Sequence, residues 1–415
     1  MQTFTLIFLG FLLANVALRG WLSWRQAAHV RANRDAVPAE FAADIPLQAH
    51  QKAADYTIAK TRLGRIDLVY TAGLLVAWTV GGGLQLLDGA WRSLGWNELA
   101  TGTAVLLSVF IITSLLELPF SIYRTFVLEE RFGFNQTKPR TFVTDLVKGL
   151  VIALLIGIPL AALVLWLMQV TGAHWWLWVW GAWTLFTLFL IWAYPTLIAP
   201  LFNTFEPLED DATRQRVETL LQRCGFNSRG IFVMDGSRRS GHGNAYFTGF
   251  GRNKRIVFFD TLLNTLDPMQ VEAVLAHELG HFRRRHIVKG MVVQFVMSLA
   301  ALALLAWLIQ TDWYFAGLGI ATSSTHLALA SFLLVIPVFA FFLQPVMAWV
   351  SRKHEFEADA FAVAQTNADS LIQALVRLYR DNASTLTPDP LHSAFYDSHP
   401  PASIRIAHLK AQAAQ

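Results

Sequence analysis

Long stretches without charge constrain the fold of this chain more than any other feature of its sequence. They form six blocks, which cover residues 1–18, 68–87, 99–116, 149–205, 290–311 and 313–351. A helix needs about 20 apolar residues to cross the hydrocarbon of a bilayer. Most blocks therefore predict one membrane span each, and the block over residues 149–205 predicts two, separated near residues 171–174.

The last block predicts a single span that begins near His326, because the polar residues 322–325 do not suit the middle of a bilayer. Together the blocks predict seven spans. Each span is expected to be a helix, since lipid cannot satisfy the hydrogen bonds of an open backbone. Only 15% of the residues are charged, against about 25% in soluble domains. We therefore expect an α-helical integral membrane protein and not a soluble enzyme.

Basic residues are concentrated in two of the connections between spans. Lys and Arg cluster between the first and second spans and between the third and fourth, whereas the second and third spans are joined by a segment with only Arg92. Basic connections stay in the cytoplasm, so the N-terminus is expected outside and the C-terminus inside. The first span lacks a basic start and a clear cleavage site, and it is expected to be retained. Strong charge segregation and the abundance of Ala and Trp suggest a bacterial inner-membrane protein.

Four segments follow from this division, namely residues 1–205 with spans one to five, 206–289, 290–351 with spans six and seven, and 352–415. The second and fourth are polar and are expected on the cytoplasmic side. In the second, apolar spacing predicts a helix over residues 211–224. Short strands are predicted at residues 230–236, 244–250 and 255–260. Asp267 is placed to cap a further helix. The single cysteine, Cys224, excludes an internal disulfide framework.

That capped helix contains the sequence His277-Glu278-Leu279-Gly280-His281. Residues four apart point the same way on a helix, so both histidines can reach one metal ion. Glu278 is angled away from direct ligation but lies close enough to take a proton from a water that attacks a peptide carbonyl. A catalytic zinc also needs a third protein ligand.

The third ligand is expected from residues 351–362, directly after the seventh span, where the candidates are His354, Glu355, Glu357 and Asp359. Glu355 and Asp359 share one helical face, whereas Glu357 points away. Glu355 can complete a site with two histidines, and Asp359 can accept the N–H of a ligating histidine. Both ligand-bearing helices flank one helical hairpin and so lie on the same side of the membrane. The sequence therefore predicts one Zn²⁺ per chain, held by His277, His281 and Glu355.

These motifs resemble those of the Ste24-type CaaX prenyl protease 1 family, integral-membrane zinc metalloproteases of the M48 type. The resemblance covers nearly the whole chain and includes "AHELGH", "EFEADAFA", "SHPPASIR", "EERFGFN" and residues 236–263. It implies seven helices around a water-filled chamber, with the zinc at its cytoplasmic end. It also implies that Asn244 binds the substrate backbone, that His399 stabilises the oxyanion and that Arg405 lines the cleft. In eukaryotes this family removes the last three residues of prenylated CaaX proteins.

The expected function is thus a zinc endopeptidase with Glu278 as general base, acting on a peptide or protein with or without a prenyl group. A second enzyme hypothesis is quality control of membrane proteins, as in the related HtpX-type proteases. A hypothesis of another class is a transporter or channel, but no broken-helix pair or inverted repeat is evident. Arg283, Arg284 and Arg285 are interpreted as topology and headgroup anchors, so the lipid bilayer is an expected partner and nucleic acid is not.

Overall fold

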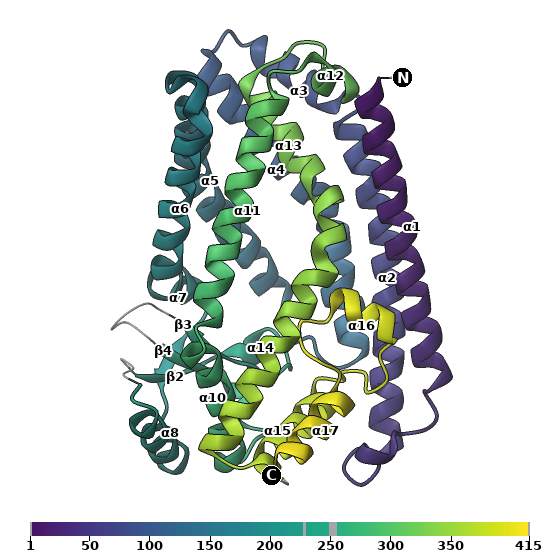
Figure 1. Ribbon diagram of the computed structural model, residues 1–415, viewed down its shortest axis with the longest axis vertical. Coiled ribbons are helices and arrows are strands. Elements are labelled where there is room, and N and C mark those ends of the chain that lie inside the picture. Colours follow the sequence, from purple (N-terminus) through teal and green to yellow (C-terminus); the bar gives the residue numbers. More distant parts are fainter. Residues whose placement is uncertain (1, 227–229, 249–254, 414–415) are drawn as a thin grey trace.

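Long helices that run along the length of the molecule dominate the fold, and a small β-sheet lies at one end (Figure 1). The computed structural model describes residues 2–226, 230–248 and 255–413. The long helices are α1 (Thr3–Ala32), α2 (Leu47–Trp78), α4 (Glu98–Tyr123), α5 (Pro139–Val170), α6 (Trp175–Ala193), α11 (His286–Leu308), α13 (Thr325–Ala340) and α14 (Gln344–Gln365). The predicted helical membrane protein is confirmed.

Six helical spans in the described residues are long and apolar enough to cross a membrane, and a bent pair of helices makes a seventh. The break predicted near residues 171–174 is present, between the end of α5 and the start of α6. The last span starts at Thr325, as expected, and continues through α14 to Gln365. Several of these helices extend well beyond the uncharged blocks, because their ends carry the basic connections.

The second span differs from the prediction. The block over residues 68–87 was expected to be one helix, but α2 ends at Trp78 and α3 (Gly83–Arg92) follows at an angle of 50°. The turn requires glycine: Gly82 has a φ of 79°, and a Cβ on Gly83 would come within 2.7 Å of the Ala77 carbonyl oxygen. Hydropathy alone does not reveal this bend, since glycine does not interrupt an apolar block.

Buried polar side chains fix α3 at the end of the molecule opposite the sheet. Asp88 accepts a 2.7 Å hydrogen bond from Nε2 of His326, and both side chains are 1% exposed. Arg92 donates to Asp88 and to Glu98. Each buried charge is therefore paired, which is the usual condition for burying one.

Four of the eight long helices have long sections without a fully buried side chain. No residue is fully buried over 58–78 of α2, 139–163 of α5, 180–192 of α6 or 287–304 of α11. A helix in a solid bundle buries one face against its neighbours. The buried residues instead form separate clusters, one at the end with α3 and others at the sheet end. This pattern indicates helices arranged around open space, as the resemblance implies.

The sheet end contains a four-stranded sheet and several short helices. The strands are β1 (Phe205–Pro207), β2 (Ile231–Met234), β3 (Ala245–Thr248) and β4 (Arg255–Phe259), in the order β1-β2-β4-β3. The three predicted strands are confirmed within the described residues, which exclude residues 249–254. The strand β1 was not predicted, because three residues directly after an apolar block give no alternating pattern. β3 is antiparallel to β4 and forms an edge of the sheet.

Helices surround this sheet and form the second hydrophobic core. The helices at this end are α8 (Asp211–Arg223), α10 (Pro268–Arg283), α15 (Ala368–Asp381), α16 (Pro390–Tyr396) and α17 (Ala402–Ala413), with the short segments α7 (Ala199–Phe202) and α9 (Asp260–Leu263). The short helix α12 (Asp312–Gly317) lies at the opposite end, beside α3 (Figure 1). Two π-helical turns, η2 (Arg124–Glu129) and η4 (Tyr194–Ile198), follow α4 and α6. Asp267 caps α10 through a capping box with Gln270, as expected from the sequence.

Candidate metal centre

Two helices that meet closely, α10 and α14, supply the residues of the candidate metal centre. Gly280 of α10 lies directly against Ala358 of α14, and a Cβ on Gly280 would come within 2.8 Å of the Ala358 Cα. Without a side chain at this position, the two backbones approach to the distance at which side chains one turn away can meet. The motif glycine therefore brings the histidines of α10 to the carboxylates of α14.

His277, His281 and Glu355 lie together, with one ligand atom of each within 4.8 Å of the others. The Nε2 atoms of the two histidines are 3.2 Å apart, and the Glu355 carboxylate oxygens lie 3.1 Å from His281 Nε2 and 3.4 Å from His277 Nε2. Two ligands on one tetrahedral zinc, at bonds of about 2.0–2.1 Å, are about 3.3–3.4 Å apart. The spacing of the three side chains fits one zinc ion.

The electrostatics of this group also suit a cation. Oε2 of Glu355 is buried, and although Nδ1 of His399 lies 2.6 Å away, no donor of the described residues meets this oxygen in hydrogen-bonding geometry. Burial and the Arg405 guanidinium lower the pKa of His277, but hydrogen bonds to Asp359 and Glu355 outweigh both and hold this pKa above its ordinary value. A buried carboxylate oxygen without a donor is costly. A metal ion would coordinate Oε2 of Glu355. It would also replace the proton that the raised pKa of His277 now favours.

The buried ion pair of Asp359 and Arg405 orients His277 on the side of its ring away from the other ligands. Its Nδ1 lies 2.8 Å from Oδ1 of Asp359, as the sequence predicts for a ligand whose other nitrogen faces the metal. Arg405 donates to both carboxylate oxygens of Asp359, at 2.7 and 2.6 Å. The guanidinium also lies 2.9 Å from Nδ1 of His277. Because a guanidinium has no lone pair, the Nδ1 proton goes to Asp359.

The placement of Arg405 differs from what the resemblance implies. Arg405 was expected to line the cleft and meet the substrate, but its side chain is only 7% exposed and is engaged by Asp359. Its neighbours make it a support for the metal ligands. This role depends on the ion pair with Asp359, which lies 46 residues earlier in the chain. No local sequence pattern predicts a pairing over that separation.

His281 has its own support, which sequence reasoning missed. Its Nδ1 lies 3.1 Å from Nδ1 of His286, and Nε2 of His286 lies 3.1 Å from Oε2 of Glu357. His354 stacks on His286, with ring centroids 4.0 Å apart. Glu357 does point away from the three ligands, as expected, yet it anchors this chain of hydrogen bonds. The sequence signal for this support is a third histidine, His286, five residues after His281. The left-handed conformation of Arg285 turns the chain so that His286 contacts His281.

Glu278 and His399 lie beside the metal group, and both side chains are at least partly exposed. Glu278 is partly exposed, and its carboxylate makes no ion pair or hydrogen bond with any residue of the described ranges. His399 comes from the loop between α16 and α17, and its Nδ1 lies 2.6 Å from Oε2 of Glu355. Its side chain is 60% exposed. Both groups are therefore accessible to a substrate.

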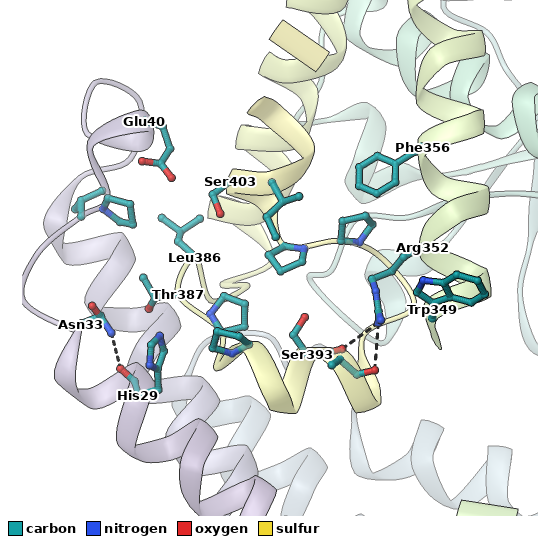
Figure 2. Close-up of a pocket in the computed structure, with 18 of the residues that line it drawn as sticks. His29, Asn33, Glu40, Trp349, Arg352, Phe356, Leu386, Thr387, Ser393 and Ser403 are labelled. Carbon is teal, nitrogen blue, oxygen red and sulfur yellow. Dashed lines mark hydrogen bonds between the residues drawn. The ribbon is translucent and has the colours of Figure 1, made fainter. Parts of the chain in front are cut away.

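The loop that carries His399 is fixed by Arg352 of α14. The Arg352 guanidinium donates to the backbone carbonyls of Ser393 and Ala394 in α16 (Figure 2). It also donates to the carbonyl of Asp397, directly after this helix. Carbonyls at a helix end lack partners within the helix, and Arg352 supplies a donor to them. A cavity of about 740 Å³ lies against the outer side of this loop, between it and the end of α1.

Asn244 directly precedes the edge strand β3. Its side-chain oxygen accepts from the Ala245 N–H, and its own carbonyl accepts from Phe259 of β4. Asn382, at the end of α15, is hydrogen-bonded to both the N–H and the carbonyl of Gly243. The start of the edge strand is therefore firmly held, while β3 has no strand on its other side in the described sheet.

Substitution of Gly280 tests the close approach of the two helices. Gly280→Val is expected to lower the free energy of unfolding by about 1–3 kcal/mol, because the added atoms overpack against Ala358. It is also expected to reduce bound zinc by moving the ligands apart. Gly290→Val is the matched control, since a Cβ there meets nothing within 4 Å. Denaturation of the detergent-solubilised protein and metal analysis measure both effects, and equal behaviour of the two variants would contradict the role of Gly280.

A metal group on a helix hairpin, an adjacent carboxylate and a free strand edge define a membrane-embedded metallopeptidase. Residues 207–413 match the model of peptidase family M48, and residues 26–204 match the CAAX prenyl protease N-terminal model, described as five membrane helices. The chain belongs to the CAAX prenyl protease 1 family of M48 metalloproteases.

Known members of the family cover most of this chain. CAAX prenyl protease 1 of Saccharomyces cerevisiae is 31% identical, over 97% of this chain and 94% of that protein. A homolog from Arabidopsis thaliana is 36% identical over 75% of this chain and 73% of its own length. The crystal structure of S. mikatae Ste24p matches with a TM-score of 0.90 at 28% identity and covers 99% of both chains.

Proposed function

We propose that this metalloprotease is a zinc endopeptidase that removes C-terminal residues from CaaX-type peptides. The observation that carries the proposal is the group of His277, His281 and Glu355, whose spacing fits one zinc ion and whose neighbour Glu278 is free to act as a base. The relatives named CAAX prenyl protease 1 support the substrate class. The fit of the residues to zinc supports the choice of metal.

Each residue has a distinct part in the proposed reaction. A zinc ion in this group would supply a Lewis acid that polarises the substrate carbonyl. Glu278 takes the proton of the attacking water and passes it to the leaving amine. His399 donates a hydrogen bond to the oxygen that becomes negative. Asp359 and Arg405 hold His277 in position, and His286 and Glu357 do so for His281.

Substrate binding is assigned to the edge strand. A peptide that adds to β3 gains backbone hydrogen bonds from an edge that is otherwise open. Asn244, at the start of this strand, is proposed to bind the substrate backbone as well. The membrane helices lead to this end of the molecule, and the basic connections support a cytoplasmic location for it. A prenyl group on the substrate and a bacterial inner membrane as the location both stay predictions, and the relatives named above are eukaryotic.

Cleavage of a farnesylated CaaX peptide by the purified protein tests this function. We expect release of the last three residues, identified by mass spectrometry, with loss of activity on chelation and recovery on addition of zinc. An otherwise identical peptide without the farnesyl group measures the contribution of the lipid. Zinc-dependent cleavage at other positions only would contradict CaaX processing and favour the quality-control hypothesis.

A further inference from the structure

A second cavity opens beside His399. Its volume is about 430 Å³, and its walls come from α2, from the end of α15 and from the loop between α16 and α17. Polar groups around it include Thr57, Lys60, Tyr379, Ser384, Asp397 and His399. Because His399 contacts both the cavity and Glu355, the cavity adjoins the metal centre.

Lys60 is the cationic side chain of this cavity, and no carboxylate of the described residues forms an ion pair with it. Its Nζ lies 3.9 Å from the centre of the Tyr56 ring, a cation–π contact, and it forms no hydrogen bond or ion pair with any residue in the described ranges. An ammonium group has three donors and no acceptor. Lys60 lines the cavity and is exposed there, with Tyr56 against one side of its ammonium group. It is therefore available to an anion that enters the cavity.

Contacts around Tyr56 place Lys60 near the start of the edge strand. The Tyr56 hydroxyl donates a 2.6 Å hydrogen bond to Glu129 at the end of η2, and Glu129 lies 3.5 Å from Nε2 of His242. His242 precedes Asn244 by two residues. The end of β3 at which the strand begins, and not its far end, therefore faces the Lys60 side of the centre.

The direction of the substrate follows from this placement. A peptide that pairs antiparallel with β3 has its own C-terminal end at the start of the strand. A peptide in the parallel direction would bring its N-terminal ammonium there, towards a lysine. The charge of Lys60 favours the antiparallel direction. Three residues beyond the cleaved bond span about 10 Å at 3.3–3.6 Å each, which is enough to leave the strand and enter a neighbouring cavity.

We propose that the cavity between α2 and the His399 loop receives the C-terminal end of the substrate, and that Lys60 binds its terminal carboxylate. The proposal rests on the peptidase function proposed above. Its ligand class is a peptide with a free α-carboxylate. Asp397 also lines the cavity, but it lies on the His399 loop whereas Lys60 comes from α2. The proposed carboxylate therefore lies on the α2 side of the cavity, against Lys60, and away from Asp397.

Two peptides that differ only at the C-terminus, one a free acid and the other an amide, test the proposal. Their affinities are measured with zinc-loaded protein carrying Glu278→Gln, so that binding is scored without cleavage. We expect about tenfold tighter binding of the acid. Adding Lys60→Met is expected to weaken binding of the acid about tenfold and leave the amide unchanged, and Lys60→Arg is expected to restore the preference.

Lys52→Met is the matched control, because Lys52 lies on the same helix over an aromatic ring, 4.7 Å from the Phe134 centroid, and does not line the cavity. It should keep the wild-type preference. Equal affinity of the acid and the amide for the protein with Lys60 would overturn the proposal. Cleavage by the protein with Glu278 intact is scored separately, so that loss of the carboxylate preference with cleavage retained leaves the peptidase function standing.

Discussion

Glu278→Gln is expected to lower kcat/KM for peptide cleavage by about 10³-fold, within the 10²–10⁴-fold that a general base contributes. Glutamine keeps the size of the side chain but cannot take the proton of the attacking water. Because Glu278 lies beside the ligands and is not one of them, bound zinc should stay at one ion per chain. Initial rates on a CaaX peptide, together with metal analysis, measure both expectations.

The matched control for this substitution is Glu272→Gln on the same helix. Glu272 pairs with Arg216 and Arg223, away from the ligands, so it should retain wild-type activity. Exposed ion pairs of this kind contribute at most about 1 kcal/mol. If Glu278→Gln cleaved at the wild-type rate with zinc bound, another residue would have to be the base.

Glu355→Ala is expected to weaken zinc binding by more than about 100-fold and to abolish cleavage. Outer residues that support a metal ligand change affinity by about 10–100-fold, and loss of a ligand should exceed that range. Competition with a chromogenic chelator gives the affinity. Glu357→Gln is the control on the same helix, because Glu357 meets only the support of His281.

The outcome for Glu357→Gln separates a ligand from its support. We expect the control to lose at most the 10–100-fold of a supporting residue. Equal zinc affinities for the Glu355→Ala and Glu357→Gln proteins would contradict the assignment of Glu355 as the third ligand.

Local patterns predict much of this fold, because helix periodicity and span length are local properties. The choice of Glu355 over Glu357 needs only the four-residue repeat of a helix, and the structure places Glu355 with the two histidines. The paired location of α10 and α14 follows from counting spans. The cap at Asp267 is likewise a short-range signal.

The remaining features depend on contacts between distant residues. Arg405 meets Asp359 only after α17 packs against α14, and no repeat in the sequence records that packing. His286 reaches His281 because Arg285 adopts a left-handed conformation that propensity does not predict. Lys60 reaches the active-site cavity because α2 extends beyond its uncharged block. The bend at Gly82 is a local feature, but a hydropathy pattern does not predict it because glycine does not interrupt an apolar block.

The crossing at Gly280 also has a mechanical meaning for the membrane. The helix α10 leads through Arg285 into α11, and α14 continues α13. The ligands therefore lie at the two ends of one transmembrane hairpin, on the same side of it. An ion shared between them is a non-covalent crosslink between neighbouring spans. The free energy of metal binding contributes to the free energy of folding. Part of the stability of the α11–α13 hairpin would therefore come from contacts outside the lipid. A metal ion bound there would restrain the two helices as well as take part in catalysis.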